Sequence, residues 1–251
     1  MSYGTLSLTL VFVLIPLLLS KTLHLQLEKD VLIATVRSII QLLAVGYFLK
    51  FIFESDHLVY ILFMVALMIG VATGNARKKG SKIKGITWKI ALTLTAIEIL
   101  VQSILLGFHI VPPTAQYIIP ISGMAIGNSM VLSILFLNRF QAEVDAHHDQ
   151  TELILTLGGT PRQAIHTQLT RAIKASMIPT IESQKTIGLV QLPGMMSGQI
   201  IAGADPVQAV QFQLLILFIL LTTAAISSIL LGFLSYPSLF NERMQLLKEK
   251  E

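Results

Sequence analysis

The sequence contains no cysteine, which excludes disulfide bonds and thiolate metal sites. Charged residues are also scarce, at 13% of the chain, whereas a soluble domain carries about 25%. Apolar residues make up 53%, and the mean hydropathy is +0.73. This composition predicts an integral membrane protein without a large soluble domain. The net charge of +4 does not indicate nucleic-acid binding, because the basic residues lie in loops beside apolar runs.

Catalytic motifs are absent as well. The chain has no HExxH zinc motif, no GxSxG hydrolase motif and no GxxxxGK[ST] phosphate-binding loop. We therefore expect no enzymatic activity and no cofactor in this chain. The first basic residue, Lys21, follows the first apolar run. A cleaved signal peptide has the opposite order, so this run is predicted to remain as a membrane helix.

The apolar runs predict one all-α permease domain over residues 1–251, with seven membrane-spanning helices. The predicted spans cover residues 5–20, 31–53, 58–74, 88–109, 117–137, 186–204 and 206–235. With seven spans, the lysine- and arginine-rich loops and the C-terminal tail all lie on one side. The positive-inside rule then places the N-terminus outside and the C-terminus in the cytosol. We expect the chain in the plasma (bacterial inner) membrane.

The loop at residues 138–185 is the largest predicted cytosolic element and is expected to form a helical hairpin. Gly158 and Gly159 are typical of a helix end. Thr160, Pro161 and Gln163 match the N-cap, first and third positions of a new helix with a capping box. Apolar residues recur on one face of that helix. We expect this face to rest on the membrane surface, on the bundle itself or on a partner protein.

Glu98 is predicted to lie near the middle of the fourth span. A carboxylate there is costly and usually faces the bundle interior. Arg37 enters the second span at a similar depth, with Gln41 and Gln102 one helical turn from the two charges. One interpretation is a buried structural ion pair. The other is that Glu98 binds or gates a cationic substrate while Arg37 neutralises it.

Residues 186–204 are long enough to cross a bilayer but form a poor membrane helix, because a Pro193–Gly194 break interrupts them. An interrupted helix has to be buried in protein or line a cavity, so this segment indicates a transport path. The candidate substrate-path residues here are Gln191, Met195, Met196 and Gln199. The two methionines could offer sulfur to a metal or could fill irregular gaps in the packing. Asn128, in the fifth span, could link helices or offer an oxygen ligand.

A further candidate metal site lies in the cytosolic hairpin. Asp145, His148, Asp149 and Glu152 occur at spacings of three and four residues. On one continuous helix these side chains would share a face, as a divalent ion requires. The alternative is a solvated polar face.

Three segments resemble the FetB-type ABC permeases, which include bacterial iron-export permeases and plant half-size permeases of aluminium tolerance. They are ISGMAIGNSM (121–130), ELILTLGGTPRQAI (152–165) and IPTIESQKTIGLVQLPGMMSGQIIAGADPVQAVQFQ (178–213). The resemblance implies a metal-exporting permease that works with a separate ATPase subunit, which would use the ATP, and with the hairpin as the docking element. The implied coupling residues are Glu152, Gly158, Gly159, Thr160, Pro161 and Arg162.

These observations lead to one main hypothesis and two alternatives. The main hypothesis is a homodimeric ABC permease in the lipid bilayer that exports a metal ion, such as iron, or a metal complex. The first alternative is a stand-alone secondary transporter in which Glu98 relays a proton or an ion. The second is a membrane scaffold or sensor that transports nothing.

Overall fold

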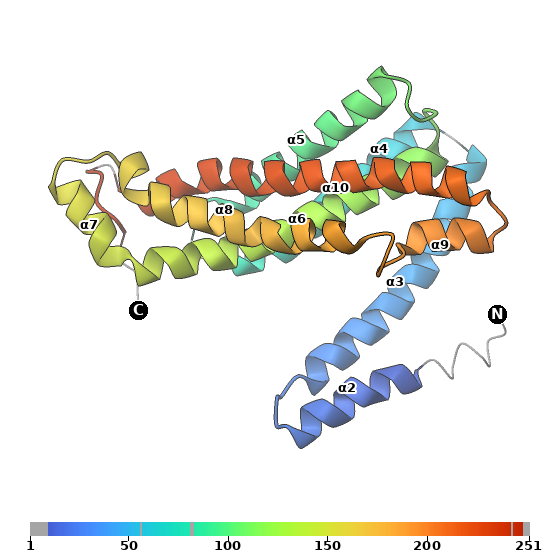
Figure 1. Cartoon of the computed structure of the whole chain (residues 1–251), viewed down its shortest axis with the longest axis horizontal. Helices are drawn as coiled ribbons and strands as arrows, with labels where there is room; N and C mark the ends of the chain where they lie inside the picture. The colour runs from blue at the N-terminus through green and yellow to red at the C-terminus, as the bar shows by residue number, and fades with distance from the viewer. Residues whose placement is uncertain (1–9, 56, 81–82, 242, 248–251) are drawn as a thin grey trace. The chain divides into compact units, whose positions relative to one another are not determined.

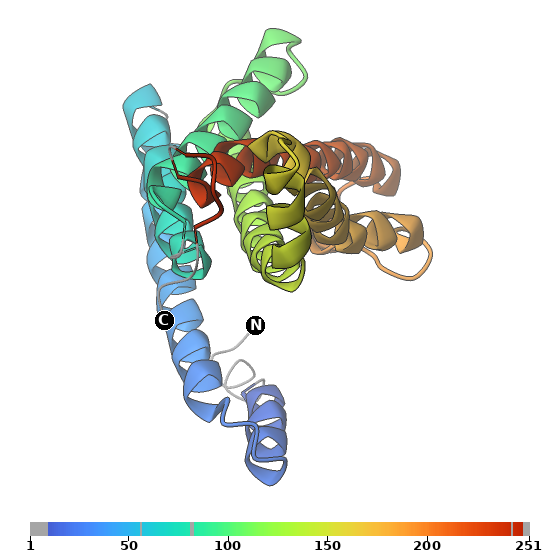
Figure 2. The same ribbon diagram turned by 90° about the vertical axis from the view of Figure 1, so that its left-hand side faces the viewer.

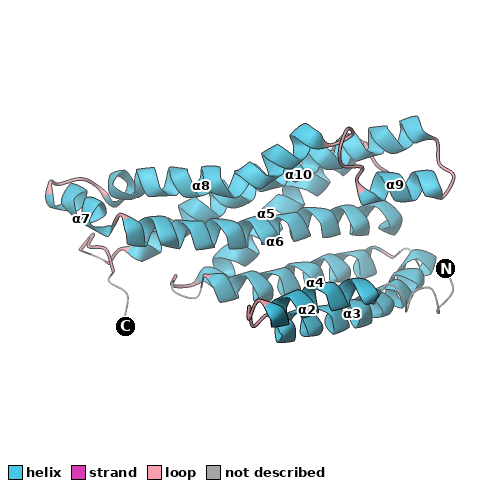
Figure 3. Ribbon diagram, turned by 60° about the horizontal axis from the view of Figure 1, so that its bottom comes forward, coloured by secondary structure: helices cyan, strands magenta, loops and turns pink. Residues whose placement is uncertain are grey.

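The computed structural model describes residues 10–55, 57–80, 83–241 and 243–247. The chain forms two compact units, residues 1–57 and 58–251. The single permease domain over residues 1–251 stays a prediction. In the described residues the regular elements are α-helices and two short 3-10 turns (Figure 3). The all-α prediction is therefore confirmed for the described part of the chain.

The first unit is a helical hairpin of α2 (Val11–Thr22) and α3 (Glu28–Ser55). Ser20 holds its turn in place. The Ser20 hydroxyl donates to Glu28 Oε1 at 2.7 Å and accepts from the Leu27 backbone N–H at 3.1 Å. Residues 5–9 of the predicted first span, 5–20, lie outside the described residues. The described helix α2 has only 12 residues, or about 18 Å of length.

The second unit is built around α6 (Ala115–Ala146), α8 (Pro161–Thr186) and α10 (Pro206–Ser235), which lie side by side (Figure 1). α6 and α10 run in the same direction and α8 runs opposite to both. Helices α4 (Leu58–Ala76) and α5 (Ile86–Gly107) pack against this group, and the 3-10 turn Arg77–Lys79 follows α4. The short helix α7 (His148–Thr156) joins α6 to α8 at one end of the bundle (Figure 2). Helix α9 (Gly194–Ile201) contacts α10 at the other end, and a second 3-10 turn, Tyr236–Leu239, follows α10.

Two buried apolar clusters hold this second unit together. The larger one joins Ile90, Phe136, Phe140, Ile165 and Leu231 with further residues of the same helices. The smaller one joins residues of α5, α6 and α10 nearer the α9 end. The predicted apolar face of the helix after Thr160 is therefore buried against its own bundle, because Ile165 and Leu169 belong to the larger cluster.

Within the described residues, five helical segments are long and apolar enough to cross a membrane: Glu28–Ser55, Leu58–Lys79, Ile86–Gly107, Ala115–Ala146 and Pro206–Leu239. They correspond to five of the seven predicted spans. The predicted sixth span at 186–204 is not one helix. Its residues form a turn over 187–193 and the eight-residue helix α9, which is only about 12 Å long. Pro193 stands at the N-cap of α9, where its ring disfavours helical geometry at Leu192.

The hairpin predicted at 138–185 is present as the end of α6, α7 and α8, but α8 reaches far along α10. The Ser176 and Ser228 hydroxyls are hydrogen bonded at 2.9 Å. Further on, Gln184 Nε2 donates to the Leu217 carbonyl at 3.2 Å. The second half of α8 therefore packs beside a candidate membrane span, although the sequence placed it in the cytosolic loop.

Candidate functional site

Glu98 lies in α5 and is 5% exposed, at the centre of a polar cluster between α5 and α6. Its Oε1 atom accepts hydrogen bonds from the Ser122 hydroxyl and from Gln102 Nε2, the latter at 2.9 Å. The same Gln102 nitrogen lies 2.8 Å from the Ser122 oxygen. Glu98 Oε2 is buried without a hydrogen-bond partner among the described residues. The cluster thus links two helices and leaves one carboxylate oxygen free to take a proton or a cation.

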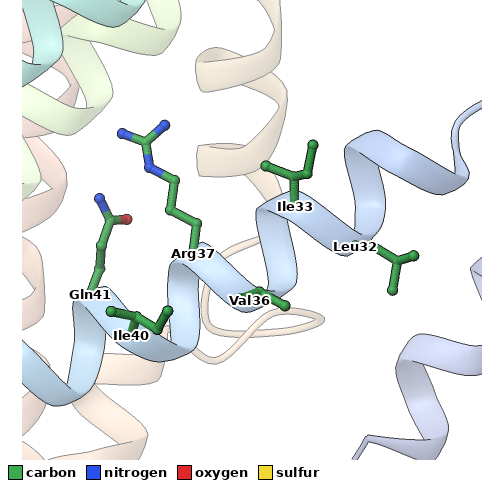
Figure 4. Close-up of a pocket in the computed structure, with 6 residues that line it drawn as sticks. All are labelled: Leu32, Ile33, Val36, Arg37, Ile40 and Gln41. Carbon is green, nitrogen blue, oxygen red and sulfur yellow. The ribbon is translucent and has the colours of Figure 1, made fainter.

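The sequence predicts Arg37 and Gln41 as partners of Glu98. Both extend from the same side of α3 (Figure 4), as their spacing of one helical turn requires. They belong to the first compact unit, whereas Glu98 belongs to the second. The ion pair between Arg37 and Glu98 therefore stays a prediction. Ser122 is a neighbour of Glu98 that was not predicted. Its position as a polar residue within an apolar run was the available signal.

Asn128 connects α6 to α10. Its Nδ2 atom donates to the Leu220 carbonyl and to the Thr223 hydroxyl, both at 3.1 Å. Leu220 also accepts from the Thr223 hydroxyl at 3.0 Å. The amide nitrogen thus supplies the helix–helix link expected of Asn128, and the amide oxygen remains an acceptor.

The segment at 186–204 lies at the far end of the bundle from α7. Met195 is partly buried against the smaller apolar cluster, which includes Ile97 and Val101 beside Glu98. Met196 and Gln199 are half-buried and Gln191 is exposed. The Ser183 hydroxyl donates to Gln191 Oε1 at 3.3 Å, which ties the turn to the end of α8. The packing of Met195 matches the gap-filling interpretation of this methionine.

The turn between α7 and α8 has the local geometry that its sequence predicts. Gly158 adopts a φ of +87°, in the left-handed region that glycine tolerates. The Thr160 backbone N–H donates to Gln163 Oε1 at 2.8 Å, and the Gln163 N–H donates to the Thr160 hydroxyl at 3.4 Å. Pro161 occupies the first position of α8. The capping box is therefore confirmed.

Contacts between the helices fix α7 and the start of α8 in place. The Arg171 guanidinium lies 3.7 Å from Glu143 Oε2 at the end of α6. The Thr151 hydroxyl of α7 is hydrogen bonded to the Gln168 amide at 3.1 Å. Arg162 lies over the ring of Phe233 in α10, 5.8 Å from its centre. These contacts tie α6, α7 and α10 to α8 at this end of the bundle.

The predicted metal site in the hairpin is not assembled. α6 ends at Ala146 and α7 begins at His148, so Asp145 lies on a different helix from His148, Asp149 and Glu152. The His148 nitrogens lie 3.8 Å from Asp149 and 3.7 Å from Glu152. Over the ranges that the structure describes, no group of three or more histidine and acidic side chains is placed to hold a metal ion. The spacing of these four residues places them on one face only if the helix is continuous, and the chain leaves the helix at His147.

The structure also contains a cavity of about 280 Å³ between α6, α8 and α10, lined mostly by apolar side chains. Its polar lining comes from Asn128, Thr180, Ser183, Gln184 and Gln213. Of these five residues, only Asn128 was predicted as a site residue. The other four lie on α8 and α10, which are distant from Asn128 in the sequence. Their polar character within helical runs was the only signal that could have identified them.

Proteins of similar sequence are known along nearly the whole chain. The family described as "Uncharacterised protein family (UPF0014)" matches residues 3–240. The UPF0014 membrane protein YjkA of Bacillus subtilis is 56% identical over 251 residues, covering 100% of both chains. The probable iron export permease protein FetB of Escherichia coli is 42% identical over 97% of this chain and 94% of its own. No solved structure matches the chain significantly.

A plant relative extends the comparison. The protein ALUMINUM SENSITIVE 3 of Arabidopsis thaliana is 33% identical over 94% of this chain and 87% of its own. The FetB relative is named as a permease and not as an enzyme. The matches run through both compact units and include the segments that suggested FetB-type permeases. The chain therefore belongs to the UPF0014 family of membrane proteins, together with FetB and its plant homologues.

Proposed function

We propose that the chain is the membrane permease subunit of an ABC transporter that exports a metal ion or metal complex. A separate ATPase subunit supplies the energy, because the sequence has no phosphate-binding loop of its own. The observation that carries this proposal is the short helix α7 at the end of the bundle (Figure 2), with Leu153 58% exposed and Leu157, the residue just after the helix, 79% exposed. Exposed leucines beside a fixed turn are suited to docking in a groove of a partner protein.

Coupling would pass through the contacts that fix α7. A push on α7 would move α8, because the Thr151 hydroxyl of α7 is hydrogen bonded to the Gln168 amide of α8. α8 continues into the turn at 187–193 and then into α9. Motion of α8 would therefore reach the broken segment at the opposite end of the bundle. Two copies of the chain, each with one ATPase, would form the transporter.

The proposed placement in a bacterial inner membrane follows the basic residues. The C-terminal segment lies beside the α7–α8 turn, since Arg243, Glu152 and Gly158 line one cavity. Arg77 and its two lysine neighbours follow the end of α4, and Ile83 and Leu246 share the larger apolar cluster. The basic loop, the hairpin and the C-terminal segment thus gather at one end, which supports a cytosolic assignment for it. Iron as the substrate is supported by the name of the FetB relative.

The test is co-expression with a candidate ABC-type ATPase from the same genome. We expect a stable complex whose ATPase rate rises with permease and falls severalfold in Arg162→Glu or Glu152→Lys. Lys174→Glu is the matched control, because Lys174 is an exposed residue of α8 away from the turn. Absence of a complex, or equal rates in all three variants, would refute the proposal.

Glu98 favours a second candidate, a secondary transporter without an ATPase. Its unpartnered Oε2 is buried in a helix that can cross the membrane, as a proton relay requires. The chain alone, reconstituted in liposomes, would then transport metal in response to a proton gradient, and Glu98→Gln would abolish this. No transport by the chain alone would eliminate the candidate.

A further inference from the structure

A cavity at the turn between α4 and α5 has no part in the proposed transport mechanism. It measures about 410 Å³, within the range of about 300–1,000 Å³ that is usual for ligand pockets. Its lining consists of Ile83, residues 85–87 and three cationic side chains, Arg77, Lys78 and Lys84. We propose that this basic cavity binds the phosphate group of an anionic phospholipid.

The basic cavity lies where two candidate membrane spans end. The span Leu58–Lys79 finishes beside it, and the span Ile86–Gly107 begins at it. Only the six residues 80–85 connect the two spans, so the cavity stays close to the membrane surface. The headgroups of the lipids lie at the level where membrane spans leave the hydrocarbon core.

The charge of the basic cavity selects an anionic ligand. Among the described residues that line it, none is acidic. The ion pairs found in the described part of the chain involve other side chains. Arginine and lysine side chains bind phosphate oxygens through charge-assisted hydrogen bonds, and basic pockets beside membrane spans bind lipid headgroups. A phosphodiester therefore supplies the negative charge that the lining lacks.

Buried contacts hold the turn that forms the basic cavity. Ile83 is 2% exposed and belongs to the larger apolar cluster. Its backbone N–H donates to the Gly80 carbonyl at 3.0 Å, and its carbonyl accepts from the Ile86 N–H at 3.2 Å. A Cβ atom at Gly80 would lie 2.7 Å from Ile86 Cγ1, so glycine permits this close approach. The cationic side chains thus extend from a fixed turn, which reduces the ordering that a ligand has to impose.

Trp88 lies at the edge of the basic cavity. A Cβ atom at Gly85, which lines the cavity, would lie 2.6 Å from Trp88 Nε1, so the indole rests against this turn. Trp88 is 56% exposed, and exposed tryptophans are enriched at the level of the lipid headgroups. It is also the only tryptophan in the sequence. Its fluorescence therefore reports on this part of the chain alone.

The test uses Trp88 as the reporter. The purified full chain is reconstituted in mixtures of phosphatidylglycerol and phosphatidylcholine in which one lipid carries bromine on its acyl chains, and bromine quenches tryptophan at contact. The ratio of quenching by the two lipids gives the preference for the anionic one, which we expect in the unmodified chain. Lys78→Gln and Lys84→Gln should each lower this preference about fivefold, the equivalent of about 1 kcal/mol for one lost cation.

Lys79→Gln is the matched control. Lys79 belongs to the same 3-10 turn as Lys78 but does not line the cavity. Because salt screens charges that do not touch the lipid, this variant should change the preference by about twofold or less. Equal effects of Lys78→Gln and Lys79→Gln would indicate diffuse attraction to a basic surface and overturn the site, as would no preference in the unmodified chain.

Inorganic phosphate distinguishes a lipid from a free anion. Added at the concentration of the lipid, it should leave the quenching unchanged, whereas reversal would assign the cavity to a soluble phosphate and overturn the lipid assignment. Thermal unfolding shows whether each variant is folded, and if Lys78→Gln is not, Lys84→Gln decides. The experiment needs neither an ATPase nor transport, so a failure of the proposed function leaves its result unaffected.

Discussion

Replacement of Glu98 separates the structural part of its cluster from the part that depends on charge. Glu98→Gln keeps an oxygen acceptor for Ser122 and Gln102 and removes only the negative charge. Glu98→Leu removes both. Glu98 Oε1 accepts hydrogen bonds from Gln102 of α5 and Ser122 of α6. We therefore expect the two variants to differ in stability although both lose the same charge.

The magnitudes follow from the contacts. Removing a carboxylate from the middle of a membrane helix relieves about 3 kcal/mol. Two hydrogen bonds to a charged acceptor become neutral ones, at a loss of about 1 kcal/mol each. Glu98→Gln should therefore change stability by about 1 kcal/mol or less, and by less still if the carboxyl is already protonated. Glu98→Leu leaves the Ser122 and Gln102 donors short of an acceptor, and so should be about 2 kcal/mol less stable than the Gln variant.

Thermal unfolding of the purified chain in detergent measures both values. A change of 1 kcal/mol shifts the Tm of a chain of this size by about 2–4 °C, so the two variants should differ by about 4–8 °C. Glu182→Gln, on an exposed residue of α8, is the control and should unfold with the unmodified chain. If Glu98→Gln unfolds as early as Glu98→Leu, the charge itself stabilises the fold and the predicted ion pair with Arg37 is favoured. Metal export by cells carrying Glu98→Gln then reports whether transport needs the charge.

Two further substitutions test the packing and the turn. Gly232→Val should lower stability by about 1–3 kcal/mol, because even a Cβ atom at Gly232 would lie 2.8 Å from Leu169 Cδ1. The control is Gly127→Val, since the space around Gly127 is open. The Gly232 variant should unfold at a lower temperature than the Gly127 variant. Thr160→Ala should cost about 1 kcal/mol by removing the cap of α8, whereas Thr160→Ser should preserve it; equal stability of the two would contradict the role of the capping box.

Local structure could be predicted from the sequence where neighbouring residues determine it. The cap at Thr160 depends on residues within three positions of it, and so does the cap of α10. There Asp205 Oδ1 accepts from the Val207 and Gln208 backbone N–H groups at 2.9 and 3.0 Å. The burial of Glu98 was also predictable, because a charged residue within an apolar run usually faces the interior of the helix bundle.

Contacts between distant residues could not be predicted in this way. Ser122 meets Glu98 across 24 positions, and Asn128 meets Thr223 across 95. The spacing of Asp145 and Glu152 suggested one helical face, but the chain turns at His147 between them. The cavity between α6, α8 and α10 is invisible in the sequence for the same reason, because Gln184 and Gln213 come together only when α8 packs on α10.

Helix α8 shows that apolar composition alone does not identify every long helix that packs beside a candidate span. It has 26 residues, enough for about 39 Å, yet it is not among the apolar candidate spans. Near its end, Lys185 and Glu182 form an exposed ion pair at 2.7 Å, one residue from Gln184, which bonds to α10. If α10 crosses the bilayer, lipid beside this pair would be unfavourable. Water or a second copy of the chain has to cover it, and both are present in the proposed homodimeric transporter, where α8 would line the path instead of facing lipid.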